Sequence, residues 1–577
     1  MAYNGLTMAA VRRELEEVLI GARVEKISQP HDFTIVFNFR TQKSIYRLLC
    51  SAHTQYARVH LTKANYANPL TAPPFCMLLR KHLQGARLQS IRQDGLERIL
   101  TFVFRAYDEF GTVTEKYLLC EIMGKHSNLI LTRPLNEEMI ILGSIKKVDA
   151  GMSRYRVVLP GEIYVAPPAQ NKLDLFTLNE DNLAAALAQH AEKKPELALV
   201  NAVAGISKDL ASQLIQEVSG QEIVHPLEIL RPLTIKLREL AERSNSGRLN
   251  PCILKHPAQK PRFFLHQDHS GSLQCFSTVN EALDAYFTLL ERKQRENQLL
   301  QQLRQIVQTS LNRLQKRLQL QQKELQEMEN ADQYKLWGEL LTASLYLLRP
   351  GMTSAQVPNY YDEEVKMTEI PLNPALSPQA NAQLYFKKYR KLHDGKKFLL
   401  KRLQNTQTEI HYLDTLLFTI EQADAGELEE IREEMELSGL IRKQKSRRKK
   451  EKPSQPLHFL SPDGIDIYVG KNNRQNEQLT LKNAHSSHYW LHVKDLPGSH
   501  VIIKNSDPPE TTLLYAAKLA ATFSKARNSA NVAVDYTQVK HVKKPKGAKP
   551  GMVIYDHHKT LFVTPFDPEK LQQLSLQ

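Results

Sequence analysis

Histidine and tryptophan gather in one short stretch near the C-terminus, residues 488–505, which reads HYWLHVKDLPGSHVIIKN. On a helix, the spacing of His488 and His492 would bring two imidazoles to one metal ion. The β-branched and aromatic residues, followed by Pro497-Gly498, instead predict a strand that runs into a turn, where residues four apart lie about 13 Å from each other. No carboxylate or cysteine stands at ligand spacing, so the sequence predicts no metal site here.

The sequence also lacks the usual signatures of catalysis. It has no GxxxxGK(S/T) phosphate loop, no convincing GxGxxG, no HExxH and no GxSxG nucleophile elbow. Its cysteines are widely spaced and form no CxxC pair, which predicts reduced thiols rather than a zinc ribbon or a disulfide framework. We therefore expect a binding protein that is not an enzyme and carries no metal or cofactor. The cysteines are Cys50, Cys76, Cys120, Cys252 and Cys275.

Basic residues outnumber acidic ones, with 77 Lys+Arg to 62 Asp+Glu, and give a net charge of +15. Such an excess favours a polyanionic partner, although a solvated basic surface gives the same count. Eight of the eleven residues 442–452 are Lys or Arg. This run is typical of a solvated linker, and also of a segment that becomes ordered on a phosphate backbone.

The sequence contains no sign of a membrane segment. The first residues, MAYNGLTMAAVRRELEEVLIG, lack the basic start and unbroken apolar core of a signal peptide. No apolar run reaches the roughly eighteen residues that a membrane-spanning helix needs. We therefore expect a soluble, cytoplasmic protein.

Hydrophobic periodicity divides the chain into consecutive parts. Residues 1–175 contain two amphipathic helices and eight β-rich runs, which predict an α+β domain with an antiparallel sheet. Further β-rich runs within 247–280 could complete that sheet across a helical insertion, residues 176–246. In this insertion VNAVAGISKDLASQLI, residues 200–215, is typical of a helix-hairpin-helix whose turn N–H groups bind phosphate. Any short helical hairpin with one glycine gives the same pattern.

Two heptad runs follow, one from Leu300 to Met328 and one from Leu392 to Ile420, each with seven of nine seam positions apolar. The first run places Arg304 at a seam position. Two such helices, joined by Gly/Pro-rich sequence, predict an antiparallel coiled-coil arm, with a parallel homodimer as the alternative. A helix of about 45 residues reaches roughly 65 Å.

The arm is predicted within residues 281–440, and a small domain at about 329–385 lies between its two helices. A basic linker, 441–455, comes next. The last part, 456–577, reads as a second α+β domain with seven strands, one helix and a basic loop, KHVKKPKGAKPG.

Several sequence blocks in this order resemble the NFACT family along the whole chain. The resemblance is specific because the blocks are independent of one another. It implies an α+β multidomain fold: a mixed N-terminal domain with a helix-hairpin-helix insertion, a long antiparallel coiled-coil arm and a C-terminal α+β NFACT-R RNA-binding domain. The blocks are YNGLTMAAVRREL, PPFCMLLRKHL, EIMGKHSNLIL, YKLWGELL, LNPALSPQANAQLYFKKYRKL, VGKNNRQNEQLTLKNA, HYWLHVKDLPGSHVII and VDYTQVKHVKKPKGAKPGMV.

The resemblance implies a ribosome quality-control factor. Such proteins bind a large ribosomal subunit that still holds a stalled peptidyl-tRNA, recruit alanyl-tRNA and support untemplated C-terminal alanine tails that mark the nascent chain for degradation. The ribosome forms the peptide bonds, which agrees with the missing catalytic signatures. The implied partners are ribosomal RNA and stalk-base proteins of that subunit, tRNA, peptidyl-tRNA and a small S4-like RNA-binding protein, all in the cytoplasm.

The family's tRNA-binding positions carry over to two short blocks. An Asp-Arg pair of the family reads Glu97-Arg98 here; Arg98 can meet a phosphate or a base edge, whereas Glu97 is one methylene longer than the family's Asp. A strand-surface ion pair between the two is the alternative. In the second block, Gly124 would allow a ligand to approach the backbone closely, and Lys125 could contact a phosphate. The alternation of inward and outward side chains along a strand places Ile122 in the core. That block is Glu121, Ile122, Met123, Gly124 and Lys125, followed by Asn128.

The C-terminal domain is expected to contact ribosomal RNA through stacked aromatic rings, histidine hydrogen bonds and phosphate contacts. Trp490 has a competing interpretation, plain core packing, which is slightly favoured. The candidate residues are Arg447, Arg448, Lys449, Lys450, Arg474, His488, Trp490, His492, Lys494, His500, Lys543 and Lys544.

Two other functions fit the sequence less well. A domain followed by a helix-hairpin-helix resembles formamidopyrimidine-type DNA glycosylases, whose N-terminal proline nucleophile is replaced here by Met1-Ala2-Tyr3. A surface-associated fibronectin-binding adhesin would need a secretion signal and an anchoring segment, and the sequence shows neither.

Overall fold

The computed structural model describes residues 3–107, 111–168, 170–220, 225–255, 260–267, 273–329, 331–443 and 454–567. The chain forms two compact units, Met1–Gln294 and Arg295–Gln577, and the boundary between them falls within the long helix α7, Val279–Glu329. Among the described helices, none combines the length and hydropathy that crossing a lipid bilayer requires.

The first unit is built on one antiparallel sheet of nine strands, in the order β4-β3-β2-β1-β5-β6-β7-β8-β9. Eight of these strands coincide with the β-rich runs of the sequence, and β9 was not predicted. The strands are β1 Arg23–His31, β2 Thr34–Arg40, β3 Ile45–Ser51, β4 Arg58–Leu61, β5 Arg87–Arg92, β6 Ile99–Tyr107, β7 Val113–Glu121, β8 Asn128–Leu135 and β9 Glu138–Ser144.

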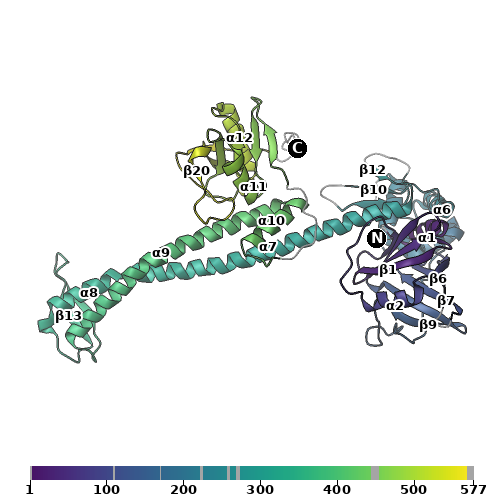
Figure 1. The fold of residues 1–577 in the computed structure, drawn as a ribbon, viewed down its shortest axis with the longest axis horizontal. Helices are drawn as coiled ribbons and strands as arrows, with labels where there is room; N and C mark the ends of the chain where they lie inside the picture. Colours follow the sequence, from purple (N-terminus) through teal and green to yellow (C-terminus); the bar gives the residue numbers. More distant parts are fainter. Residues whose placement is uncertain are drawn as a thin grey trace. The chain divides into compact units, whose positions relative to one another are not determined.

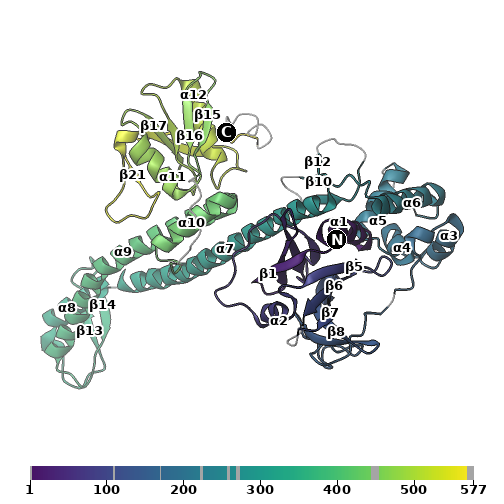
Figure 2. The ribbon, with the colours of Figure 1, turned by 45° about the vertical axis from the view of Figure 1, so that its right-hand side comes forward.

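Two helices cover one face of this sheet, α1 (Gly5–Leu19) and α2 (Pro74–Leu83), as Figure 2 shows. Alternate residues of the strands, such as Phe37 and Phe39, point into the core that they share. The side chain of Asn4 caps α1 by accepting a hydrogen bond from the Thr7 N–H, which satisfies one of the free donors at the helix start.

A group of short helices forms the predicted insertion. The helices α4 and α5 are joined by a turn at Gly205, whose φ of +77° favours glycine. This turn packs against the sheet domain: the Leu6 N–H donates to the Gly205 carbonyl at 3.1 Å. A short helical hairpin is therefore present, and phosphate binding by its turn stays a prediction. The elements are η2 Leu175–Thr177, α3 Glu180–Ala188, α4 Pro195–Ala202, α5 Lys208–Ser219 and α6 Leu230–Ser246.

The prediction that residues 247–280 complete the large sheet is wrong. They form a separate sheet, β11-β10-β12, made of Arg262–Phe264, Cys252–Leu254 and Leu273–Cys275. In this sheet β10 is the central strand and pairs with both β11 and β12, and none of the three pairs with a described strand of the large sheet.

The prediction of five reduced cysteines is also wrong for two of them. Cys252 and Cys275 form a disulfide, and the other three cysteines are free and buried. The pairing of β10 with β12 sets these two residues directly opposite each other, although 23 positions separate them in the sequence. Their spacing carries no motif, so the proximity follows from strand register alone.

In the second unit, α7 packs against α9, Pro378–Gln422, and Figure 1 draws the two helices side by side. The pair is antiparallel, because Arg304 forms an ion pair with Glu421 at 3.4 Å while Met328 lies at Gly395. The prediction of an antiparallel pair within one chain is confirmed. The seam contains Leu303, Val307, Leu311 and Leu314 of α7, with Tyr412, Leu413, Leu416 and Ile420 of α9.

The heptad pattern predicted that Arg304 lies in this seam, and this prediction is wrong. The neighbouring residue Leu303 is buried there, and Arg304 is exposed. A third helix, α10 (Ala425–Leu437), adds Leu428 and Ile431 to the same core. The additional helix widens the buried stripe beyond the two positions per heptad of a simple coiled coil.

A small domain lies between α7 and α9 in the sequence, as predicted. It consists of α8 (Ala331–Ala343), η3 (Leu345–Leu347) and the hairpin β13–β14 (Ser354–Pro358 and Met367–Pro371). Trp337 packs edge-on against Tyr334 and Tyr385 in its core.

The C-terminal domain has an antiparallel sheet in the order β15-β16-β18-β17-β19-β22. Helix α12 (Glu510–Thr522) covers one face, and α11 (Asn473–Gln478), the π-turn η4 (Leu479–Asn483) and the ribbon β20–β21 cover the other. The sequence did not predict α11, because this helix buries polar side chains such as Asn473 and Gln475 instead of apolar ones. The strands are β15 Leu457–Leu460, β16 Asp466–Val469, β17 Tyr489–Val493, β18 Val501–Ile503, β19 Val532–Gln538, β20 Val542–Lys543, β21 Ile554–Tyr555 and β22 Lys559–Val563.

Candidate nucleic-acid interface

The two candidate tRNA-binding blocks meet at one end of the interior strands β6 and β7 of the nine-stranded sheet. This end of the two strands is called the edge below. Glu97 and Arg98 directly precede β6, and the second block begins with the last residue of β7. The two strands are antiparallel neighbours, with Ile99 opposite Glu121. The Ile122 N–H donates to the Arg98 carbonyl at 2.8 Å. Strand pairing therefore brings together two blocks that are separated in the sequence.

Arg98 is a partly buried charged group at this edge whose donors are unused among the described residues. Its side chain is partly buried, and desolvation lowers the pKa of its guanidinium, against a smaller raising effect from the Glu97 carboxylate. Within the described ranges, its guanidinium forms no hydrogen bond or ion pair, including with Glu97. A partly dehydrated guanidinium with unused donors is well suited to bind a phosphate or a base edge.

Glu121 has a different role from the one predicted for it. Its carboxylate is fully buried and receives two hydrogen bonds from Arg156, each at 2.6 Å, and a third from the Tyr164 hydroxyl at 2.9 Å. Burial, and then the Glu121 charge, raise the pKa of Tyr164. Because these partners occupy the carboxylate, Glu121 positions the edge of the sheet and does not face a ligand.

The rest of this block divides into buried and exposed positions. Ile122 is in the core, as predicted, and Asn128 is also buried, where it donates to the Lys146 carbonyl at 2.8 Å. Met123 is partly buried, and its N–H donates to the Ser127 hydroxyl at 2.8 Å. Gly124 has a φ of +62°, so this position of the turn requires glycine-like freedom. Lys125 is exposed and can reach a ligand.

Two residues that the sequence did not single out, Lys172 and Gln93, join this edge. Burial, and then the charge of Arg98, lower the pKa of Lys172, so the two cations are close. Gln93 donates to the Glu97 carbonyl at 2.9 Å and to the Gly5 carbonyl at 3.1 Å, and its buried Oε1 has no partner among the described residues.

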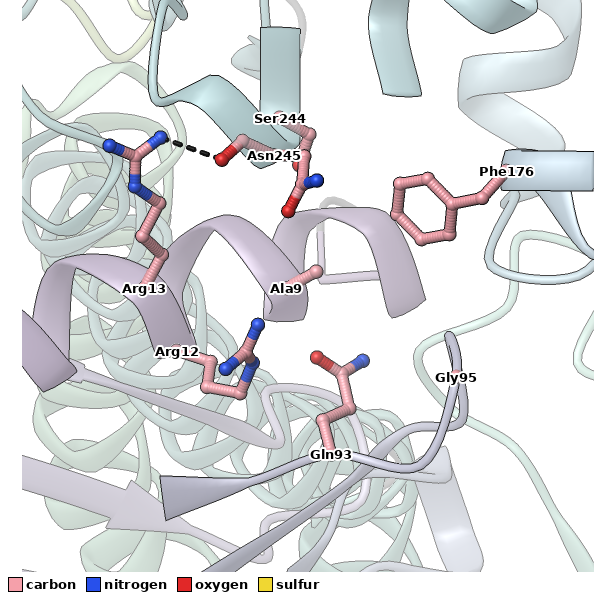
Figure 3. A pocket seen from close by; sticks show the side chains of 8 residues that line it. All are labelled: Ala9, Arg12, Arg13, Gln93, Gly95, Phe176, Ser244 and Asn245. Atoms are coloured by element: carbon pink, nitrogen blue, oxygen red, sulfur yellow. Dashed lines mark hydrogen bonds between the residues drawn. The ribbon is translucent and has the colours of Figure 1, made fainter. Parts of the chain in front are cut away.

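Gln93 also lines a cavity of about 140 Å³, shown in Figure 3. The ring of Phe176, which is 47% exposed, and the carboxamides of Gln93 and Asn245 point toward the space over Ala9. An unpaired base can stack on an aromatic ring and form hydrogen bonds with amide groups, and this cavity offers both. The lining residues are Ala9, Arg12, Arg13, Gln93, Gly95, Phe176, Ser244 and Asn245.

The two arginines of this cavity are already engaged within the protein. Arg12 donates twice to Glu16, at 2.8 and 2.9 Å, and Arg13 donates to the Asn245 carbonyl at 2.8 Å. Arg13 also forms an ion pair with Glu17 at 3.3 Å, so acidic partners compensate both arginines. The available positive charge lies next to the cavity, at Arg98 and Lys172. No sequence motif marks these residues, because they come from four separate segments of the chain.

In the C-terminal domain, Trp490 is a core residue. It is 0% exposed and packs against His492, with ring centroids 5.7 Å apart, and edge-on against His500 at 5.3 Å. The prediction that it stacks on RNA bases is wrong for this conformation, and the competing core interpretation holds. Cross-strand neighbours from β18 and the π-turn fill the space around its ring.

The two histidines beside Trp490 are kept neutral by the same core. Desolvation lowers the pKa of His492 to about 4, and it also lowers the pKa of the fully buried His500. The Thr480 hydroxyl and the Nδ1 of His500 are hydrogen-bonded at 2.8 Å. His500 therefore offers no surface to RNA, and His492 has at most a partly exposed edge.

The remaining candidates of this domain differ in availability. Arg474 pairs with Glu433 at 3.2 Å, and Lys544 pairs with Glu477 at 2.6 Å. His488 is partly buried, and desolvation lowers its pKa. Lys494 and Lys543 are exposed. The candidates Arg447, Arg448, Lys449 and Lys450 lie outside the described residues.

Comparison with known proteins gives consistent matches along the chain. A family model described as NFACT N-terminal and middle domains matches residues 4–454, and one described as NFACT protein RNA binding domain matches residues 455–556. The chain is similar to a Bacillus subtilis (strain 168) protein named Rqc2 homolog RqcH, with 38% identity over 569 residues that cover 98% of both chains.

Two Streptococcus suis proteins are also similar to the chain. One, from strain 05ZYH33, is again named Rqc2 homolog RqcH and is 36% identical across 100% of both chains. The other is a solved structure, the C-terminal part of the fibronectin/fibrinogen-binding protein FBPS. It is 37% identical, and the match covers 49% of this chain and 100% of that one, with a TM-score of 0.40.

Proposed function

Since the chain belongs to the NFACT family, we propose that it is a ribosome quality-control factor, an RNA-binding protein that is not itself an enzyme. Its similarity to proteins named Rqc2 homolog RqcH over nearly the whole length supports this assignment. The net charge of +15 agrees with a polyanionic partner.

In this proposal the protein binds a large ribosomal subunit that carries a stalled peptidyl-tRNA, through ribosomal RNA and stalk-base proteins. It recruits alanyl-tRNA and promotes an untemplated C-terminal alanine tail, which marks the nascent chain for degradation. The ribosome forms the peptide bonds in the cytoplasm, and a small S4-like RNA-binding protein assists. Residues 176–246 act as a helix-hairpin-helix domain, and 456–577 supply ribosomal RNA contacts through exposed cations such as Lys494 and Lys543.

One observation carries the tRNA part of the proposal. The guanidinium of Arg98 lies at the shared edge of β6 and β7 without a partner among the described residues. Lys172 adds a second cation beside it, and Gln93 connects this edge to the cavity under Phe176. A phosphate at Arg98 and Lys172 and an unpaired base in the cavity would use both features of this surface.

The substitution Arg98→Ala tests this. We expect it to weaken tRNA binding about five- to 150-fold and to reduce the tRNA that co-purifies with the tagged protein, since a good Arg contact is worth roughly 1–3 kcal/mol. Binding to large ribosomal subunits in a sedimentation assay should persist. Arg105→Ala is the matched control, because Arg105 is exposed on the same strand.

Equal loss of tRNA in both variants would show a general charge effect and would contradict the assignment of Arg98. Loss of both tRNA and subunits in Arg98→Ala alone would also contradict it. A wild-type protein that binds neither tRNA nor large subunits would overturn the proposed function as a whole.

A further inference from the structure

A cluster of metal-ligating side chains lies in the C-terminal domain. His541 ends the short helix η5 (Val539–His541), just before β20, and Asp556 and His557 follow β21. One ligand atom from each of the three lies within 4.8 Å of the other two. We propose that His541, Asp556 and His557 form a binding site for a transition-metal ion of the Zn²⁺ class.

The distances suit such an ion. The His541 Nδ1 and the Asp556 Oδ1 are 3.5 Å apart. In a tetrahedral site with metal–ligand bonds of about 2.0–2.2 Å, two ligand atoms lie about 3.4 Å from each other. The first two ligands are therefore already at coordination distance. The ring centroids of His557 and His541 are 4.6 Å apart, and the ligand atoms of all three residues lie within 4.8 Å of one another, so His557 would have to move closer to complete the set.

The backbone holds these residues together. β20 and β21 pair with Val542 opposite Tyr555, and the Asp556 N–H donates to the His541 carbonyl at 3.3 Å. The Thr537 hydroxyl is within 3.1 Å of the Asp556 carbonyl and 3.3 Å of the His557 carbonyl, so it can donate to either. His557 has a φ of +51°, a conformation that histidine adopts more readily than most residues with a Cβ.

The ligand types select the class of metal. Two imidazoles and one carboxylate suit Zn²⁺ and neighbouring transition metals, whereas Ca²⁺ and Mg²⁺ prefer oxygen ligands throughout. The fourth position remains for water. Lys540, Lys543 and Lys559 lie nearby in the sequence, and their positive charge lowers the affinity without removing the ligands.

The site differs from the sequence expectation of no metal, which rested on spacing along the chain. Fifteen positions separate His541 from Asp556, and the ribbon β20–β21 brings them together. A bound ion would link the two ends of the basic loop 544–553. The proposed ion thus stabilises the geometry of that loop.

Titration of the full-length chain, without a histidine tag and after chelator treatment, tests the site. We expect one saturable Zn²⁺ site by calorimetry, and visible absorption from Co²⁺ in the same position. His541→Ala and His557→Ala should each weaken binding at least about tenfold, since even outer-shell partners of a metal are worth 10–100-fold. His558→Ala is the matched control, because His558 faces Asp535 at 3.9 Å and should leave binding unchanged.

Asp556→Asn provides a ligand variant of unchanged shape, in case an alanine variant fails to fold, and it should weaken binding as well. Absence of a saturable site in the wild type would overturn the proposal. So would equal affinity of the wild type and the three ligand variants, or anomalous scattering from zinc at another position in a crystal.

Discussion

Two charged residues at the same edge of the nine-stranded sheet show how burial decides the role of a side chain. Arg98 directly precedes β6 and Glu121 is the last residue of the paired strand β7, and the sequence predicted both as tRNA-binding candidates. Glu121 is fully buried and accepts three hydrogen bonds from Arg156 and Tyr164, whereas Arg98 is partly exposed and has no partner among the described residues. The proposed tRNA contact therefore rests on Arg98, and Glu121 is assigned a supporting role in the same proposal.

The pair of Glu121 and Arg156 gives a prediction of stability. The side chain of Arg156 is 13% exposed and that of Glu121 is 0% exposed. Removing one partner of a buried pair leaves the other charge without compensation, so Arg156→Ala should lower the free energy of unfolding of the first unit by about 3–5 kcal/mol. Urea denaturation measures this. The exposed control Arg105→Ala should change it by less than about 0.5 kcal/mol. Similar values for the two variants would show that the pair is not buried in solution.

The neutral histidines beside Trp490 predict a pH dependence. His492 has a pKa of about 4 in the folded domain and about 6.5 in an unfolded chain. As the pH falls from 6.5 toward 4, only the unfolded chain takes up this proton, so the domain loses stability. Above pH 6.5 His492 is neutral in both states, and the full stability is retained. Hydrogen exchange of the amides in β17 and β19 at several pH values measures the effect.

The neutral variant His492→Gln isolates this contribution and should flatten the dependence. The variant is needed because burial raises the pKa of Glu434 in the same unit. A raised carboxyl pKa makes the fold more stable as the pH falls, which is opposite to the effect of His492. An unchanged slope in the variant would mean that His492 is already protonated or solvated in the fold.

At the scale of elements, the long helix α7 illustrates how a regular pattern is modified by its neighbours. Its sequence follows a heptad, but α9 and α10 together cover a wider stripe than two seam positions, and Leu303 is buried instead of Arg304. The helices nevertheless pack through the positions that the pattern predicted for most of their shared length, because a 3.5-residue repeat keeps one face of α7 toward α9.

Leu311→Ala tests this packing. Leu311 is 1% exposed between α7, α9 and α10, and its truncation should lower the stability of the helical core by about 2–5 kcal/mol. Leu320→Ala is the control, since Leu320 is on the same helix and 68% exposed. Thermal unfolding of the two variants compares them directly. If Leu320→Ala destabilises the protein as much, another surface covers that face of α7.

At the scale of the whole molecule, charge gives the main prediction. Residues 444–453 contain six basic side chains, and they connect the helical core with the C-terminal domain in the sequence. If these residues bind phosphates, a Gly/Ser replacement should reduce the slope of log affinity against log salt by roughly 0.7–0.9 per lost contact. Filter binding to large ribosomal subunits at several salt concentrations measures the slope.

A scrambled version of this segment is the control and should keep the wild-type slope, because phosphate neutralisation depends on charge and not on order. A Gly/Ser variant with the wild-type slope would show that the segment serves only as a spacer.

The sequence alone determined most of the strands and helices, β9 and α11 excepted, and the order in which the parts follow one another. It predicted eight of nine strands in the first sheet, all the principal strands of the last domain, and the antiparallel pair of long helices. These features depend on local periodicity, which a single segment carries within itself. Family resemblance also placed Arg98 among the candidates from sequence alone.

Only the tertiary structure decided which residues stand together and which are buried. The disulfide of Cys252 with Cys275, the buried Glu121, the buried Trp490, and the cluster of His541, Asp556 and His557 all depend on strand register between distant segments. A single residue type does not reveal that register, because register depends on the hydrophobic pattern of both paired strands and on the turns that connect them. The separate sheet β11-β10-β12 is a further case, because the β-rich pattern of residues 247–280 predicts strands but not the strands with which they pair.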